Sequence, residues 1–344
     1  MAYELGQLLE AMVAAGPPLA IETATAIART TFGVAGRIDR LTGERDENFR
    51  ISTAEGDSFV LKISHPAEDE ATLSLMTAAL LHMEATAPDI VCPRVHRALN
   101  GQTLVHFSDD NGQARTVRLL GWVPGRPLRD ADRSSLQRRG CAQLAAAMAT
   151  GLRGFRHPAA ARPLIWDLAN FDVVTTLLKD LPDLPARGFI SDFASAYRAE
   201  VGYRLSDFRQ QVVHNDLNAN NVMVDEADNA TVIGVIDFGD MVETALIADV
   251  AIAASAQVTD PSTALSDVTE FTLAYHRANP LLPDEAAALN WLIAARLVTD
   301  AVIPSWHRAH NPDEVHYARV DATYIERRVA IVEQLMHARI VIPF

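Results

Sequence analysis

The sequence predicts an α+β fold in two lobes, a small antiparallel β-sheet followed by a larger, mostly helical lobe. Short β-favouring runs separated by glycines fill much of residues 1–122, and long helical patterns dominate residues 123–344. One β-branched island, residues 211–238, interrupts those helices. A chain of 344 residues is long enough for two lobes. We therefore expect an N-lobe over 1–122 and a C-lobe over 123–344.

The N-lobe is predicted to begin with an amphipathic helix, followed by β-favouring runs between residues 31 and 63. The last of these runs, FVLKI, places Lys62 among apolar residues. Apolar residues at three- and four-residue steps predict a helix over 68–86. Three further strand patterns follow, and the composition changes at the turn Pro124-Gly125, close to the expected lobe boundary.

The C-lobe is predicted to be helical except for its β-branched island. In the island, three short runs are joined by polar turns, an unusual setting for so many polar side chains on a helical body. Helical periodicity covers residues 134–153, 192–208, 265–278, 284–303 and 313–338.

Composition limits the classes of partner. The formal net charge is −14 and the pI is about 5.2, so the protein repels nucleic acids and anionic lipid surfaces. An acidic surface suits a cationic or zwitterionic substrate. The two cysteines are far apart and suggest neither a disulfide nor a zinc site. We expect a cytoplasmic protein without a secretion signal or membrane partner, either a monomer or a homodimer.

The island carries a constellation of oxygen-bearing side chains. His214 to Asn221 form an H-x-D-x-x-x-x-N run, and Asp237 follows in IDFGD. Phosphoryl transfer needs a carboxylate to accept the proton of the attacking hydroxyl and oxygen ligands for Mg²⁺. Asp216 fits the first role, and Asn221 and Asp237 fit the second. A hairpin between them would bring Asn221 close to Asp237.

Other residues fit supporting roles. His214 is expected to shape the loop through hydrogen bonds rather than to titrate. Lys62 alone reads as an edge-strand lysine that reaches solvent, but beside the island it becomes a candidate ligand of the α- and β-phosphates of ATP or GTP. The turn around Gly43, Arg45 and Asn48 would cover the phosphates with backbone amides.

Three acidic residues follow the second motif. Asp240 and Glu243 are candidates to line a pocket for a substrate ammonium group. Asp249 has two interpretations, the same pocket or a cap for the helix DVAIAASA.

At these residues the chain resembles the aminoglycoside phosphotransferase and choline kinase superfamily, which has a bilobal protein-kinase-like fold. HNDLNANN with GVIDFGDM is most similar to the hydroxylysine kinase branch, which phosphorylates the side-chain hydroxyl of 5-hydroxylysine with GTP. The resemblance implies a catalytic base at Asp216, magnesium ligands at Asn221 and Asp237, and phosphate contact by Lys62. It also implies that a hinge hydrogen-bonds the nucleotide base, at Leu119, Gly121 and Trp122.

The sequence departs from that family at one position. A glutamate usually lies on the helix after the lysine strand and pairs with the lysine, whereas the matching turn here holds Ser74 or Met76. Glu70, one turn earlier, is the alternative partner for Lys62. Aminoglycosides, choline, homoserine and other amino alcohols remain alternative acceptors, and a catalytically silent nucleotide-binding protein is the alternative of another class. A protein kinase is disfavoured because no activation segment follows IDFGD.

Overall fold

A six-stranded antiparallel sheet forms the centre of the smaller part of the chain, in a computed structural model that describes residues 18–344 except 44–45, 110, 312–316 and 318. The strands run in the order β1-β2-β3-β6-β4, and β5 also pairs with β6. Their bounds are β1 Arg37–Leu41, β2 Glu47–Ser52, β3 Ser58–Ile63, β4 Val95–His96, β5 Val105–Ser108 and β6 Ala114–Gly121. The predicted antiparallel sheet is confirmed.

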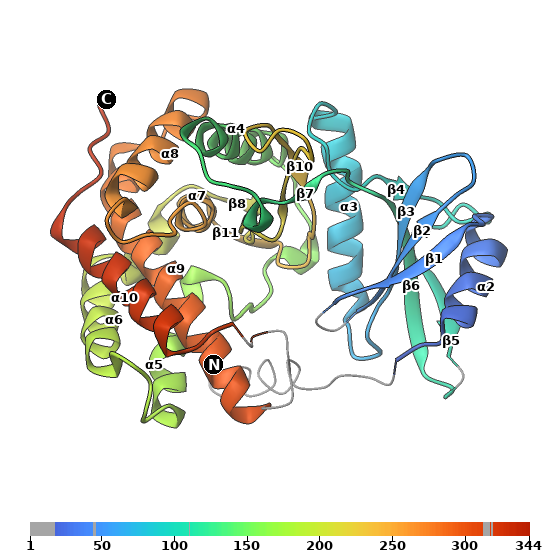
Figure 1. Cartoon of the computed structure of the whole chain (residues 1–344), viewed down its shortest axis with the longest axis horizontal. Coiled ribbons are helices and arrows are strands. Elements are labelled where there is room, and N and C mark those ends of the chain that lie inside the picture. The colour runs from blue at the N-terminus through green and yellow to red at the C-terminus, as the bar shows by residue number, and fades with distance from the viewer. Residues whose placement is uncertain (1–17, 44–45, 110, 312–316, 318) are drawn as a thin grey trace.

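Helices cover both faces of this sheet (Figure 1). Helix α2 (Ile21–Phe32) packs on one face, where alternate strand residues such as Phe49, Leu61 and Leu119 are buried. Helix α3 (Glu70–Thr86) lies on the other face, between the sheet and the helical part of the chain. Successive side chains of a strand project from opposite faces of the sheet, so the residues next to these three in each strand project toward α3.

Helix α3 is also attached to the helical part of the chain. It begins at the N-cap Asp69, whose side chain accepts the amide of Ala71. Near its end, His82 Nε2 and Thr86 Oγ1 lie 3.0 and 2.9 Å from the carbonyl oxygen of Gly151. These contacts hold α3 against the helical part of the chain, which carries the site described below.

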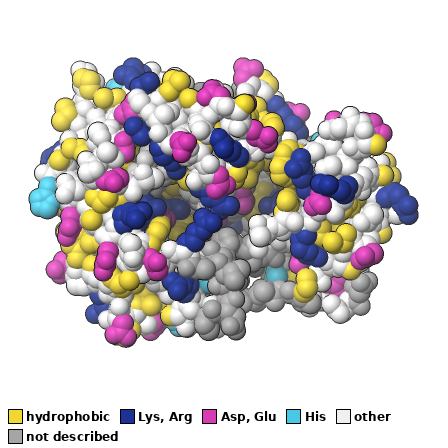
Figure 2. Space-filling view, in the orientation of Figure 1, with side chains coloured by type: hydrophobic (Ala, Val, Ile, Leu, Met, Phe, Trp, Pro, Cys, Tyr) yellow, Lys and Arg dark blue, Asp and Glu magenta, His cyan; other side chains and the backbone are white. Residues whose placement is uncertain are grey.

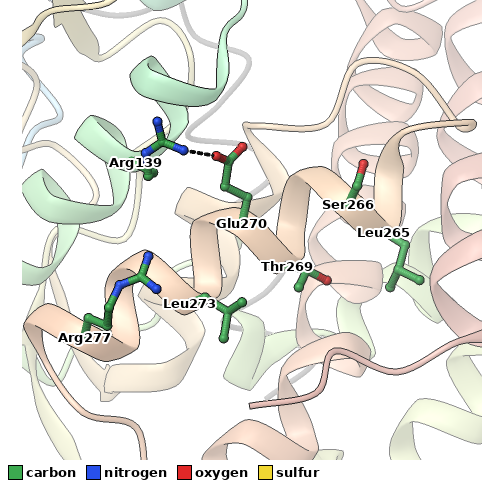
Figure 3. Close-up of a pocket in the computed structure, with 7 residues that line it drawn as sticks. All are labelled: Arg139, Leu265, Ser266, Thr269, Glu270, Leu273 and Arg277. Atoms are coloured by element: carbon green, nitrogen blue, oxygen red, sulfur yellow. Dashed lines mark hydrogen bonds and ion pairs between the residues drawn. The ribbon is translucent and has the colours of Figure 1, made fainter. Parts of the chain in front are cut away.

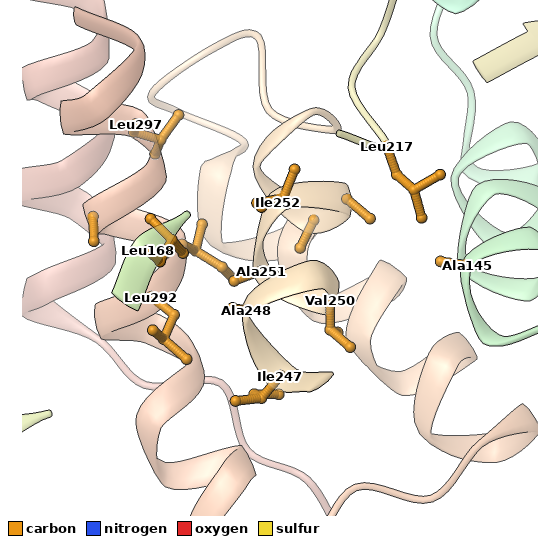
Figure 4. Packing of buried hydrophobic residues seen from close by; sticks show 14 of the residues in the cluster. Ala145, Leu168, Leu217, Ile247, Ala248, Val250, Ala251, Ile252, Leu292 and Leu297 are labelled. Carbon is orange, nitrogen blue, oxygen red and sulfur yellow. The ribbon is translucent and has the colours of Figure 1, made fainter. Parts of the chain in front are cut away.

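The larger part of the chain is mostly helical. Its centre is α7, all ten of whose residues are buried, and Figure 4 shows Ile247, Val250 and Ile252 of this helix among apolar side chains of its neighbours. The helices are α4 Ser135–Gly151, α5 Asp172–Leu177, α6 Arg187–Glu200, α7 Leu246–Ser255, α8 Ala264–Ala278, α9 Pro283–His310 and α10 Ala322–His337. Short 3-10 helices lie at Leu128–Asp130, Pro158–Ala160, Leu168–Asn170, Leu178–Asp180 and Gly202–Asp207.

Helix α9 is long and apolar enough to cross a membrane by length and composition, alone among the helices of the described residues. Its most apolar window is 78% buried inside the protein, and the helix packs against α7 and α10. We therefore interpret α9 as a core helix.

Two small sheets lie on the helical body. One has the order β10-β9-β7, and the other pairs β11 with β8. Their bounds are β7 Arg126–Pro127, β8 Gln210–Val213, β9 Val222–Val224, β10 Val232–Val235 and β11 Val242–Ala245. The predicted island is therefore present. Strand β11 was not predicted, since its four residues read as the start of the following helix.

The helix predictions differ from the structure at three places. The predicted helix 284–303 is too short, because α9 continues to His310. The predicted helix 192–208 is displaced, because α6 ends at Glu200 and a 3-10 helix continues the chain. The predicted helix 313–338 begins only at Ala322, and the first part of that range and the amphipathic opening helix lie outside the described residues. The lobe division at 122/123 stays a prediction.

Candidate active site

The hairpin of β9 and β10 brings the two halves of the predicted motif together. Val222 lies opposite Val235, and the amide of Ile236 donates to the carbonyl oxygen of Asn221 at 2.8 Å. Asn221 therefore precedes one strand where Asp237 follows the other. The predicted meeting of these residues at one end of a hairpin is confirmed.

Asp216 is the centre of a hydrogen-bond network at that end of the hairpin. Its Oδ1 accepts from Asn218 Nδ2 at 2.7 Å, and its Oδ2 accepts from Asn221 Nδ2 at 2.5 Å. The side chain keeps 19% of its surface exposed. Burial, and then the charge of Asp240, raise the pKa of Asp216 well above its ordinary value, which makes the carboxylate a better proton acceptor.

His214 holds the loop in the way the sequence predicts. Its Nε2 lies 3.2 Å from the carbonyl oxygen of Ile236, and its Nδ1 accepts the amide of Asp216 at 3.2 Å. These partners require the neutral ring with the proton on Nε2. Burial lowers the pKa of His214 to about 4, so the ring stays neutral at physiological pH.

The backbone of the site adopts a conformation that L-residues rarely adopt. Asn215 and Asp237 have φ angles of 63° and 60°. The strained Asn215 amide donates to Asp249 Oδ1 at 2.7 Å, and burial raises the pKa of Asp249 to about 7. Asp249 thus neither caps α7 nor lines a pocket; it lies inside the first turn of α7 and anchors the catalytic loop.

Asp237 and Asn221 have the ligand chemistry that Mg²⁺ prefers. The charge of Lys62 is the main cause that lowers the pKa of Asp237, so this carboxylate is ionised. Asn221 uses its amide nitrogen on Asp216, which leaves its Oδ1 for a cation. The donor set of one carboxylate and one amide oxygen therefore fits magnesium.

Three polar residues form a row across the N-terminal sheet, facing α3. Asn48 lies opposite Lys62 on β2 and β3, and Lys62 lies opposite Arg118 on β3 and β6. Directly opposite residues project from the same face of a sheet. Lys62, which the sequence singled out, is thus accompanied by an arginine that the sequence analysis missed, because only the strand register places the two together.

Arg118 lies against the turn of α3 on which the related family usually has a glutamate. It is 3% exposed, its Nη1 lies 3.3 Å from Met76 Sδ of α3, and its Nη2 lies 3.8 Å from Asp46 Oδ2. The suggested pairing of Glu70 with Lys62 is wrong, because Glu70 Oε1 instead lies 3.3 Å from His106 Nε2 in an exposed pair. No ion pair within 4 Å joins Lys62 to an acid of the described residues.

The predicted phosphate turn is only partly described, because Arg45 lies outside the described residues. Gly43 packs so closely against Asn48 that an added Cβ would lie 2.4 Å from Asn48 Nδ2. Asn48 Nδ2 donates to the carbonyl oxygen of Asp46 at 3.3 Å, while its buried Oδ1 has no partner among the described residues. Gly43 and Asn48 therefore shape a turn next to Lys62.

The three predicted base contacts are already engaged within the protein. Leu119 is buried on the opposite face of the sheet, against α2. The amide of Gly121 donates to Arg94 O at 2.7 Å, and that of Trp122 donates to Ser58 O at 3.0 Å. The amide donors of Gly121 and Trp122 are thus satisfied by strand pairing, and their contact with the nucleotide base stays a prediction.

A second unpredicted arginine, Arg296 of α9, contacts Asp216 with Nη2 3.3 Å from Oδ1. Of the two predicted substrate residues, Asp240 is close enough to raise the pKa of both Asp216 and Arg296. Glu243 lies on β11 with no recorded contact to either. The structure therefore brings Asp240 into the site but not Glu243.

The surface is hollowed between the two parts of the chain, and Lys and Arg side chains gather around this hollow (Figure 2). A separate shallow pocket on α8 is lined by none of the predicted site residues (Figure 3). It is lined by Arg139, Leu265, Ser266, Thr269, Glu270, Leu273 and Arg277.

The chain is similar to several known kinases over most of its length. Hydroxylysine kinase of Mus musculus is 25% identical over 91% of this chain and 89% of its own length, and that of Danio rerio is 24% identical over 88% of each. A microcompartment-associated aminopropanol kinase has a TM-score of 0.67 at 16% identity, covering 92% of this chain and 98% of its own. An amicoumacin kinase, solved with AMP-PNP and Ca²⁺, has a TM-score of 0.65 at 14% identity, covering 93% and 94%.

These neighbours establish the kinase-like fold. The model of the phosphotransferase enzyme family matches residues 38–281, a span that includes the lysine strand, the catalytic loop and Asp237. The chain therefore belongs to the phosphotransferase enzyme family, and it is a small-molecule kinase with an alcohol group as acceptor.

Proposed function

We propose that the protein transfers the terminal phosphate of ATP or GTP to the hydroxyl of a small amine-bearing metabolite, and that 5-hydroxylysine is this acceptor. One observation carries the proposal: Asp216, Asn221 and Asp237 meet at one end of a hairpin, while Lys62 is near enough to lower the pKa of Asp237. The names of the curated relatives support the choice of acceptor.

Lys62 and Arg118 supply two positive charges for the nucleotide phosphates. Their position in one row beside the Gly43 turn suits a polyphosphate that crosses the face of the sheet. Asn221 and Asp237 would hold Mg²⁺, which when bound neutralises charge on the phosphates. We assign the base contact to the amide of Val123, the first hinge amide without an acceptor among the described residues.

Asp216 orients the acceptor hydroxyl. As the acceptor oxygen bonds to the γ-phosphorus, the bond from that phosphorus to the β–γ bridging oxygen breaks and the nucleoside diphosphate leaves. The hydroxyl proton passes to a carboxylate oxygen of Asp216 and from there to solvent. Asn218 and Asn221 hold the carboxylate in place, so positioning provides much of the rate.

A panel of acceptors tests the proposal. The purified protein with Mg²⁺ and either ATP or GTP is incubated with 5-hydroxylysine, homoserine, choline, 1-amino-2-propanol or kanamycin, and phosphorylated products are measured by mass spectrometry. We expect kcat/KM for 5-hydroxylysine to exceed that for each other compound by at least about tenfold. Faster transfer to another compound would refute the acceptor, and no nucleotide turnover at all would indicate a silent nucleotide-binding protein.

A further inference from the structure

Arg296 is a buried cation in direct contact with the proposed catalytic base. Its side chain is only 6% exposed, its Nη2 lies 3.3 Å from Asp216 Oδ1, and its Nε donates to Asp300 Oδ1 at 2.8 Å. The centre of the guanidinium lies 5.3 Å from the centroid of the Trp166 ring. Two carboxylates and an aromatic ring therefore fix the orientation of the group.

One nitrogen of this fixed guanidinium is unsatisfied. Arg296 Nη1 is buried and has no hydrogen-bond partner among the described residues. A buried, charged donor without an acceptor is unfavourable, so an acceptor supplied by a ligand would satisfy this nitrogen. Nη2 of the same guanidinium is the nitrogen that contacts Asp216, so a substrate whose hydroxyl reaches Asp216 lies next to this group.

The charges around Arg296 are mostly negative. Asp216, Asp240 and Asp300 all raise the pKa of this arginine, and together they more than offset the opposing effect of burial. Arg162 is also close enough to Asp240 for the two charges to interact, so the three carboxylates share two guanidiniums. The site thus leaves one cationic donor, Arg296 Nη1, without an acceptor among the described residues.

We infer that Arg296 Nη1 binds the carboxylate of the acceptor, so that the enzyme recognises a hydroxylated amino acid and discriminates against amino alcohols that lack this group. The inference rests on the proposed function and deepens it, because it names the residue that selects the acceptor. A guanidinium can hold Asp216 and a substrate carboxylate at the same time through different nitrogens. Arg296 therefore acts as a specificity residue as well as a positioning residue.

A comparison of 5-hydroxylysine with its α-carboxamide tests the inference. The two molecules share one skeleton and differ in the negative charge. We expect the wild-type kcat/KM to favour the carboxylate by about 100-fold. In Arg296→Gln, whose amide nitrogen takes the place of Nε beside Asp300 and which lacks both terminal nitrogens, the preference should fall to within about threefold, and Arg296→Lys should be intermediate.

The ratio of kcat/KM for the carboxylate to kcat/KM for the carboxamide distinguishes recognition of the carboxylate from a purely structural role of Arg296. Loss of support for Asp216 would slow both substrates equally, whereas loss of the carboxylate ligand changes their ratio. Arg138→Lys is the matched control, because Arg138 is a half-buried arginine paired with Asp267 and Glu270 at 3.1 and 3.0 Å, between α4 and α8. This control should leave the ratio unchanged.

Two results would overturn the inference while the kinase reaction stands: an unchanged ratio in both Arg296 variants, or a wild-type enzyme that phosphorylates the carboxamide equally well. Failure of the proposed function has another signature, since the wild-type enzyme would then not phosphorylate 5-hydroxylysine in preference to the other compounds of the panel. Thermal melting monitors folding of each variant, and if Arg296→Gln does not fold, the Arg296→Lys ratio decides.

Discussion

The two walls of the site are built in different ways. On the helical side, Asp216, Asn221 and Asp237 lie within 22 positions of one another and meet through a single hairpin. On the sheet side, Asn48, Lys62 and Arg118 span 71 positions and meet only because three strands pair in one register. The first wall is a local structure and the second is a non-local one, and the sequence motif describes only the first.

The two walls also differ in the contacts that support them. The catalytic loop is held by buried hydrogen bonds from His214 and Asp249, with two backbone residues in the left-handed region. The cationic row is covered by α3, which offers the sulfur of Met76 rather than a carboxylate. The helical wall is therefore rigidly specified, while the sheet wall holds two cations that we propose contact the phosphates of the nucleotide.

The largest effect should come from the centre of the helical wall. Asp216→Asn removes the proton acceptor but keeps the shape of the side chain, so we expect kcat to fall at least about 1,000-fold, or about 4 kcal/mol. Nucleotide affinity should change by less than about threefold, as measured by calorimetry. Asp228→Asn, in the exposed turn of the same hairpin, is the matched control. Normal turnover in the Asp216 variant would show that Asp216 is not the proton acceptor and that the helical wall does not carry the catalytic base.

The anchor of the helical wall should show a pH dependence. The pKa of Asp249 is raised to about 7, so the folded protein binds more protons than the unfolded chain between about pH 4 and 7. The contribution of Asp249 to the free energy of unfolding therefore falls as pH rises through this window. In Asp249→Asn, which keeps an oxygen acceptor for the Asn215 amide, this contribution is absent.

Urea unfolding of both proteins at pH 5 and pH 7 measures the difference. We expect the stability of Asp249→Asn relative to the wild type to increase by about 1.4 kcal/mol for each pH unit. A constant difference across this window would show that Asp249 titrates normally and that its burial does not govern its charge.

The sheet wall is tested by Arg118. Arg118→Met removes one of the two charges that we propose contact the phosphates and keeps an apolar contact with Met76, so the KM for nucleotide should rise about 10- to 50-fold, or about 1.4 to 2.3 kcal/mol. The kcat for the acceptor should change much less. Steady-state kinetics with varied nucleotide measures this KM. An unaltered KM would show that Arg118 does not contribute to nucleotide binding, which would leave Lys62 as the only cation of the row with that role.

The smallest effect is expected at Glu70. Its pair with His106 is exposed on both sides, and such pairs contribute about 0 to 1 kcal/mol. Glu70→Gln should therefore leave the KM for nucleotide within about twofold of the wild type. A rise as large as that in Arg118→Met would restore the pairing of Glu70 with Lys62 in the working enzyme.

Much of the fold followed from local patterns in the sequence. The apolar periodicity of α3, α4 and α8 and the β-favouring runs of the small sheet placed these elements within a few residues. Strand β11 escaped prediction because its four residues continue directly into α7. The displaced α6 shows the same limit, since helix ends depend on packing that a pattern does not contain.

The sequence by itself determined the chemistry of the helical wall, because a hairpin brings residues together that are near neighbours in the chain. Only the tertiary structure decided that Arg118 lies beside Lys62, that the amides of Gly121 and Trp122 are engaged by strand pairing, and that Arg296 reaches Asp216 from 80 positions away. The physical reason is strand register and helix packing: a shift of one residue would turn Arg118 to the opposite face of the sheet, and no local pattern fixes that choice.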